Sequence, residues 1–216
     1  MESDPAEVSA TRKVSLRSVV TKATKDANRL TINRPAVSAG ELMVAAVDVL
    51  GSPTITPPPG WTMVRTDTNA TAMRQAVYNK VATSNEPKSY SWDFSPRRST
   101  AGIILVYQGA AGVSPVESSS GEPSSGASNS VTAPGVSPTA TDSLVVGFFG
   151  MVGNPSITPP PGMFERAEIA QNGGPARIVL EASDELRPPS GATGARTATG
   201  TQSQANIGQL VVIRPQ

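Results

Sequence analysis

Carboxylates are the only side chains through which this sequence could carry out acid–base catalysis, because its 216 residues include no His and no Cys. That composition excludes imidazole general bases, thiolate nucleophiles, disulfides and the ordinary ligand sets of zinc. A pair of carboxylates could hydrolyse a glycosidic bond; the candidates are Asp48, Asp67, Asp93, Glu165, Glu168, Glu181, Asp184 and Glu185. They form no motif and mostly stand beside turns or on the polar side of a strand, so we expect solvated charges and no enzymatic activity.

Metal and cofactor motifs are also missing from the sequence. Calcium requires clustered oxygen ligands of the D-x-D-x-D-G kind, and the nearest alternative is a loop site formed by Glu181, Asp184 and Glu185. The phosphate-binding, dinucleotide-binding and nucleophile-elbow motifs are absent. We therefore expect no metal ion and no cofactor.

Positive and negative charges are nearly balanced along the chain. With 18 Lys and Arg against 17 Asp and Glu, the net charge of +1 gives no field that would attract nucleic acid or anionic lipid. Arg97 and Arg98 beside Pro96 form a small basic spot, which we interpret as solvated loop charge; the alternative is a contact with a partner's carboxylates. No apolar run approaches the ~18 residues of a membrane span, and the first 16 residues contain no apolar core of a secretory signal. We expect neither a nucleic acid nor a membrane as partner.

Aromatic side chains alternate with polar ones in the segment SYSWDF. Tyr90, Trp92 and Phe94 therefore share one side of an expected strand, and Ser and Asp occupy the other side. An exposed row of rings would be a flat platform for a glycan. We favour the alternative, in which the rings face the core, because the opposite side of the strand is polar.

A duplication organises the chain. Residues 42–62 (LMVAAVDVLGSPTITPPPGWT) match residues 144–164 (LVVGFFGMVGNPSITPPPGMF) at a constant offset of 102. At the same offset AVYNKVA (76–82) matches IVLEASD (178–184), and at an offset of 106 AGIILVYQ (101–108) matches IGQLVVIR (207–214). Each half therefore contains the same elements in the same order.

The triple proline of each copy predicts a rigid corner. Proline lacks an N–H, so the run cannot lie in a central strand; the next glycine allows a sharp turn, and a large apolar residue then closes the end of a core. The residues are Pro57, Pro58, Pro59, Gly60 and Trp61 in the first copy and Pro159, Pro160, Pro161, Gly162 and Met163 in the second. The alternative is a proline-rich ligand for a partner's aromatic groove, which the occurrence of the same corner twice disfavours.

Short apolar runs rich in Val, Ile and Leu, bounded by Gly, Pro and Ser, predict strands rather than helices. We expect an all-β protein with about five or six strands per half and essentially no helix. Each half has only two strongly apolar strands, too few to close its own core, so we expect a single jelly-roll-like β-sandwich of two tandem repeats related by a pseudo-twofold axis. The expected boundaries are an arm at 1–13 and a sandwich at 14–216, with repeat one at about 14–110, a Ser/Gly/Pro-rich linker at 111–127 and repeat two at about 128–216.

The segment VSAGELMVAAVDVLGSPTITPPPGWTMVRTDTN resembles a T-I-T-P-P-x-G-W β-sandwich module of actinobacterial surface and secreted proteins and of minor tail proteins of their phages. The resemblance covers about residues 14–214, in both halves, and implies the architecture without implying catalytic residues. Met163 stands where the module has an aromatic residue.

These features together favour a non-enzymatic structural protein of a tailed-phage virion, either a minor tail protein or a capsid decoration protein. Its partners would be other virion proteins in a homo-oligomeric or otherwise repeated assembly, and the arm at 1–13 would dock on a neighbouring subunit. The alternative is a secreted or cell-surface adhesin or carbohydrate-binding module that binds a glycan through the aromatic strand face.

Overall fold

The computed structural model describes residues 13–171, 173–187 and 191–216, and all of their regular secondary structure is β-strand. The all-β prediction is therefore confirmed, and within these ranges no helix is long and apolar enough to cross a membrane. The strands are β1 (Ser15–Asn33), β2 (Leu42–Leu50), β3 (Ile55–Thr56), β4 (Thr62–Asn69), β5 (Met73–Val81), β6 (Ser89–Gln108), β7 (Val116–Pro123), β8 (Ser128–Ala133), β9 (Ser143–Val152), β10 (Ile157–Thr158), β11 (Phe164–Gln171), β12 (Ile178–Arg187), β13 (Arg196–Gln204) and β14 (Asn206–Ile213).

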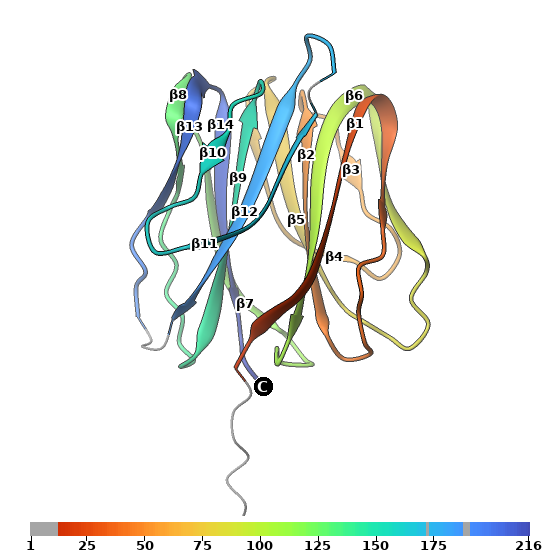
Figure 1. Cartoon of the computed structure of the whole chain (residues 1–216), viewed down its shortest axis with the longest axis vertical. Coiled ribbons are helices and arrows are strands. Elements are labelled where there is room, and N and C mark those ends of the chain that lie inside the picture. The colour runs from red at the N-terminus through yellow and green to blue at the C-terminus, as the bar shows by residue number, and fades with distance from the viewer. Residues whose placement is uncertain (1–12, 172, 188–190) are drawn as a thin grey trace, which may run out of the picture.

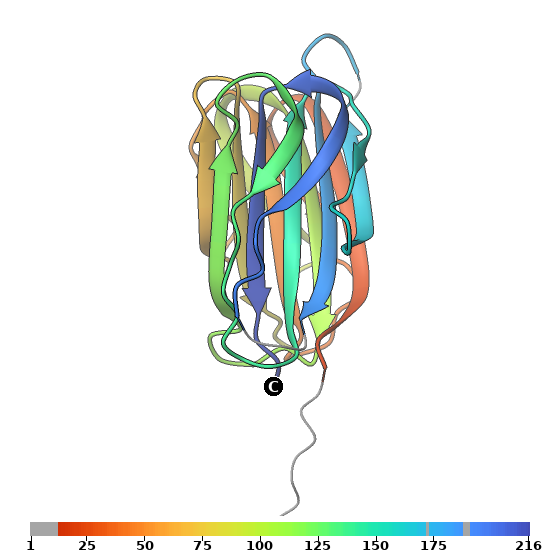
Figure 2. The same ribbon diagram turned by 90° about the vertical axis from the view of Figure 1, so that its left-hand side faces the viewer.

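Two antiparallel sheets of five strands form the centre of the molecule. The first has the order β1-β6-β2-β5-β4, and the second has the order β11-β12-β9-β14-β7. The distal parts of β1 and β6 bend away and form a three-stranded ribbon with β3, while β10, β13 and β8 form a separate three-stranded sheet. Figure 1 shows these layers side by side, from β8 and β13 on the left to β3 on the right. Figure 2 looks onto the β10-β13-β8 layer with the second five-stranded sheet behind it.

The strand order of the second half repeats that of the first. β4-β5-β2-β6-β1 corresponds to β11-β12-β9-β14-β7, and β3-β6-β1 corresponds to β10-β13-β8. One long strand of the first half thus matches two strands of the second: β1 matches β7 and β8, and β6 matches β13 and β14. The pairing of β1 with β6 shifts register between Thr24, Ala27 and Arg29, as expected where β-bulges redirect a strand.

Three hydrophobic clusters fill the spaces between the layers. The central cluster lies between the two five-stranded sheets and includes Leu105 and Phe148. A second cluster lies inside the first half around Trp92, and a third lies inside the second half around Phe149. The expectation that neither half closes a core of its own is wrong, because strands such as β2 and β9 are buried on both faces and alternate side chains serve different clusters.

The expected linker at 111–127 contains a strand. Residues 116–123 form β7, which pairs with β14 along its length. Backbone hydrogen bonds hold this edge strand whatever its side chains are, so a Ser- and Gly-rich sequence does not prevent it. Gly121 has a specific role, because a Cβ there would collide with the side chains of Arg65 and Asp67, and Arg65 donates a hydrogen bond of 2.8 Å to the Gly121 carbonyl.

The offset between the halves changes along the chain. Met63 pairs with Tyr78, and Glu165 pairs with Ser183. β4 therefore matches β11 at an offset of 102, but β5 matches β12 at an offset of 105. The expected match of 76–82 with 178–184 is displaced by three residues, because the sequence between β11 and β12 is three residues longer than that between β4 and β5.

Candidate functional site

Each triple-proline segment forms a tight turn that leads from an outer layer into a central sheet. Trp61 N–H donates to the Pro58 carbonyl at 3.3 Å, and Met163 N–H donates to the Pro160 carbonyl at 3.1 Å. Gly60 and Gly162 have φ values of 82° and 86°, which fits a type II turn with Pro and Gly at its central positions. The side chains of Trp61 and Met163 are buried, so both corners end in an apolar plug.

The aromatic row of the first half faces the core. Tyr90, Trp92 and Phe94 are all buried, and the Trp61 ring packs edge-on against Tyr90 and Trp92 with centroid distances of 5.1 and 5.3 Å. The interpretation of the row as a glycan platform is wrong, because no ring face is left for a sugar. The strand alternation turns these rings toward β2 and β5 and leaves the polar side chains outside.

Four of the eight candidate carboxylates are buried rather than solvated. Asp48, Glu181 and Asp184 are at most 1% exposed and Glu185 is 8% exposed. Asp67 and Glu168 are half-buried, and Asp93 keeps an exposed ion pair with Arg29. The expectation of surface charge fails for residues on β2 and β12, since these strands lie between two strands of their own sheet and between two layers.

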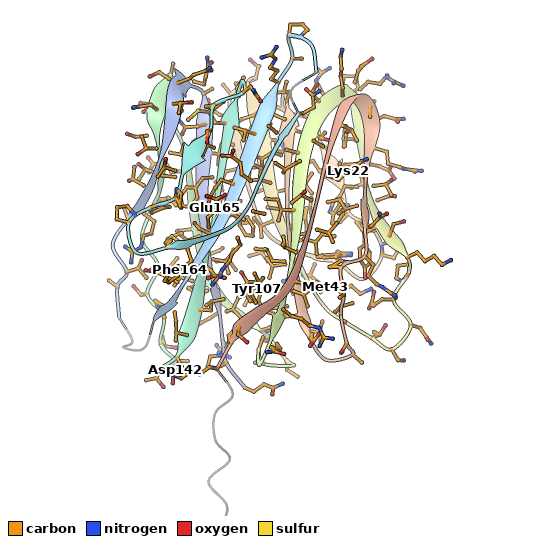
Figure 3. All side chains as sticks on the ribbon, in the orientation of Figure 1. Lys22, Met43, Tyr107, Asp142, Phe164 and Glu165 are labelled. Carbon is orange, nitrogen blue, oxygen red and sulfur yellow. The ribbon has the colours of Figure 1, made fainter. Side chains whose placement is uncertain are left out.

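Asp184 ties the two central sheets together. The Tyr107 hydroxyl of β6 donates to one of its oxygens at 3.0 Å, and Arg166 of β11 donates to the other at 2.6 Å. Figure 3 marks Tyr107 at the boundary between the two halves. Burial, helped by the Asp184 charge, raises the pKa of Tyr107 well above its ordinary value. Because each oxygen of Asp184 already accepts a hydrogen bond, this carboxylate links the two sheets and is poorly placed to accept a proton from a substrate.

A pocket of about 310 Å³ opens beside this tie. Its lining combines Arg166 and Asp184 with apolar side chains, of which Phe164 is 67% and Leu186 37% exposed. The guanidinium of Arg166 also lies 5.7 Å from the centroid of the Phe164 ring. The pocket offers an apolar contact surface with one charged pair, which suits contact with a protein better than catalysis.

Glu181 is the most unusual titratable group. It is fully buried inside the second half, and neither carboxyl oxygen has a hydrogen-bond partner among the described residues. Burial raises its pKa to about 9; the nearby Ser183 hydroxyl opposes this rise, and the charges of Glu165 and Glu168 add to it by smaller amounts. Glu168 lies directly opposite on β11 and accepts a 2.6 Å hydrogen bond from the Ile157 N–H. Glu181 is therefore a neutral acid at pH 7, enclosed where no substrate reaches it.

A third group of buried polar side chains lies between the central sheets. Gln75 donates to one oxygen of Asp48 at 3.3 Å, while the other oxygen has no partner in the described part of the chain. Burial raises the pKa of Asp48 well above its ordinary value. Gly150 faces this carboxyl from β9, and a Cβ at Gly150 would overlap it. Nearby, Gln209 of β14 donates to Asp67 of β4 at 2.7 Å, which is a second polar tie between the sheets.

The alternative calcium loop does not exist. Glu181, Asp184 and Glu185 lie within strand β12, whose alternation turns Asp184 toward Tyr107 of the first half. Glu185 faces the other way and is ion-paired with Arg196 at 2.7 Å. In residues 13–171, 173–187 and 191–216 no group of three or more acidic side chains has the geometry of a metal site.

The surface offers two further features. Arg97 is exposed and lies 3.5 Å from Asp26, and Arg98 donates to the Arg97 carbonyl. A polar pocket of about 320 Å³ at the β7–β8 connection is lined by hydroxyl groups, the Glu122 carboxylate and the Asn206 amide.

No family model, curated protein or solved structure matches the chain.

The burial of four candidate carboxylates was not predicted from the sequence. A signal for it was present, since Asp48 and Glu181 each interrupt an apolar run.

Proposed function

We propose that the chain is a non-enzymatic structural protein of a tailed-phage virion, as a minor tail protein or a capsid decoration protein. The observation that carries the proposal is the use of its buried charged and polar groups as ties. Asp184 joins Tyr107 of the first sheet to Arg166 of the second, and Gln209 joins the sheets again through Asp67. In an enzyme such groups would point at a substrate; here they hold the layers together, as a structural scaffold requires.

The finer architecture belongs to the same proposal. We infer that the two halves are related by a pseudo-twofold axis that passes between β2 and β9. Three contacts support it: β1 lies against β11, β4 lies against β7, and β2 lies against β9. Under the strand correspondence given above, the first two contacts exchange with each other and the third maps onto itself, as a twofold axis demands.

Particle composition tests the proposed function. Particles purified from the source of the chain should contain it at a fixed copy number, measured by quantitative mass spectrometry. A version lacking residues 1–13 should keep the fold, measured by circular dichroism, but be lost from particles, because this arm is proposed to dock on a neighbouring subunit. Recovery of the chain only from the cell envelope or culture medium would refute the virion location, and full incorporation of the truncated chain would refute the role of the arm.

The alternative function, a secreted or cell-surface adhesin, is supported by the hydroxyl-lined pocket at the β7–β8 connection. Ser128, Ser130 and Thr132 contribute to its wall, and such groups hydrogen-bond sugar hydroxyls. A glycan array that compares the native chain with Ser130→Asp would decide it. Binding by the native chain that the variant loses would favour the adhesin.

A further inference from the structure

Five cations lie on the three segments that meet where β1 and β6 bend out of the first sheet. Lys22 and Lys25 lie on β1, Arg97 and Arg98 lie on β6, and Arg177 lies in the turn before β12. All five are exposed or half-buried. We call them the basic rim.

Contacts bring these three segments together. Lys25 Nζ lies 2.8 Å from the position that a Cβ on Gly174 would take, and Arg177 Nε donates to the Gly174 carbonyl at 2.7 Å. The side chains of Lys25 and Arg177 therefore both lie against Gly174. Arg97 is 3.5 Å from Asp26, the residue after Lys25.

The positive charge of the rim is poorly compensated. Within the described residues, the only ion pair of the rim is that of Arg97 with Asp26, whose side chains are 65% and 71% exposed. Such a pair contributes little in water. The remaining four cations have no carboxylate within ion-pair distance in the described part of the chain, so only dissolved salt screens their charge.

A segment of complementary charge precedes the described part of the chain. Residues 1–8 read MESDPAEV and carry Glu2, Asp4 and Glu7 with no Lys or Arg. They join the fold at the start of β1, which lies at the end where the C-terminus is found, whereas the β1 bend lies at the other end (Figure 1).

Binding of this segment to the rim of its own chain is constrained by length. Lys25 is ten strand residues beyond Ser15, about 33 Å, and Asp4 is eleven residues before Ser15, at most about 38 Å of extended chain. The segment would have to run back fully extended along β1. The rim of a second copy imposes no such path.

We propose that the basic rim of one copy binds the acidic segment 1–8 of a second copy, so that copies associate end to end. This inference rests on the proposed structural function and names the partner of the arm. The two surfaces differ, so each contact is heterologous, and copies close by reciprocal exchange into a dimer, close into a larger ring, or continue as a filament. One contact is weak, and repetition in an assembly strengthens it through avidity.

Sedimentation velocity of the full chain tests the proposal at about 20 mM and about 300 mM salt. The native chain should form oligomers at low salt and dissociate at high salt. Lys25→Glu should be monomeric at both, and the matched control Lys88→Glu, an exposed lysine without an ion pair in the described residues and next to the far end of the ribbon, should behave as the native chain. Equal behaviour of the two lysine variants would overturn the proposal, as would a native chain that is monomeric throughout.

Charge exchange identifies the partner. A variant with Glu2→Lys, Asp4→Lys and Glu7→Lys, and a second with Lys25→Glu and Arg177→Glu, should each be monomeric alone. An equimolar mixture should recover salt-sensitive oligomers, because the altered segment of the first variant matches the altered rim of the second, and the native segment of the second matches the native rim of the first. Failure of the mixture to associate would overturn the proposal, as would polyphosphate binding to the rim of a chain that stays monomeric. Particle incorporation is a separate readout: a chain that enters particles without self-association refutes only this inference, and one that self-associates but is absent from particles refutes only the virion location.

Discussion

Replacement of Glu181 by Gln is expected to remove a fall in stability that the native chain shows as the pH rises. The folded chain holds the Glu181 proton up to a pKa of about 9 because the carboxyl is fully buried. The unfolded chain releases the same proton above a pKa of about 4.3. Folding at pH 7 therefore requires uptake of a proton, and each pH unit between the two pKa values costs about 1.4 kcal/mol.

The size of the effect follows from this difference. Relative to acidic solution, Glu181 should lower the free energy of unfolding by about 4 kcal/mol at pH 7, and the loss should continue until about pH 9. Gln has nearly the same shape and no proton to lose. The free energy of unfolding of Glu181→Gln minus that of the native chain should therefore grow with pH over this window.

Urea unfolding followed by tryptophan fluorescence measures this difference at about pH 5, 7 and 8.5. Other titrating groups affect both proteins equally and cancel in the comparison. Glu122→Gln, at an exposed position, is the control and should show no growing difference. A gap between Glu181→Gln and the native chain that stays constant from pH 5 to 8.5 would refute the conclusion that Glu181 is enclosed as a neutral acid.

Three further predictions concern two packing contacts and the acid stability contributed by Glu86. Trp61→Ala should cost about 3–5 kcal/mol of unfolding free energy in urea titrations, because it empties the corner of the first core. Gly150→Ala should cost about 1–3 kcal/mol through overlap with the Asp48 carboxyl and less in an Asp48→Ala background, where Gln75 Nε2 still lies within 3 Å of the new Cβ; a double-mutant cycle would reveal the difference. Burial alone would raise the pKa of Glu86, but hydrogen bonds from Lys80, Thr83 and Tyr90 outweigh it and lower the pKa to about 2. Stability from Glu86 is thus present above its unfolded pKa and lost as the pH falls from about 4.3 to about 2; Lys80→Met should reduce this acid-side loss in pH-dependent thermal melts.

The duplicated corner was predictable because its Pro-Pro-Pro-Gly run is identical in both copies and the conformational needs of these residues are local. Pro fixes φ and Gly supplies the positive φ, so Gly60 and Gly162 could be assigned turns without knowledge of the fold. Strand β7 was not predictable in this way. Its pairing depends on the neighbouring strand β14, and nothing in VESSSGEP distinguishes an edge strand from a linker.

Neither the basic rim nor the burial of the carboxylates was predicted from the sequence, and the reasons are related. Lys25, Arg97 and Arg177 come from segments far apart in the sequence, so a net charge of +1 conceals a local concentration of positive charge. Glu181 was aligned at the wrong offset, with Asn79 instead of Ala76, because the preceding turn is longer in the second half. Only the register of paired strands shows that a carboxyl stands where the first half has a core alanine.

The corrected register also explains why the second core accommodates Glu181. Where the first half has the rings of Trp61, Tyr78, Tyr90, Trp92 and Phe94, the second half has Met163, Ser183, Arg196, Ala198 and Gly200. Phe149 and Glu181 stand where the first half has Val47 and Ala76, and their larger side chains fill part of the volume that the missing rings would occupy. The second half therefore buries less aromatic surface than the first half, and in addition it buries the Glu181 carboxyl. Both effects make its own core contribute less stability than that of the first half. The central cluster, shared by both five-stranded sheets, must then hold the second half in place, and we expect that half to be unable to fold by itself.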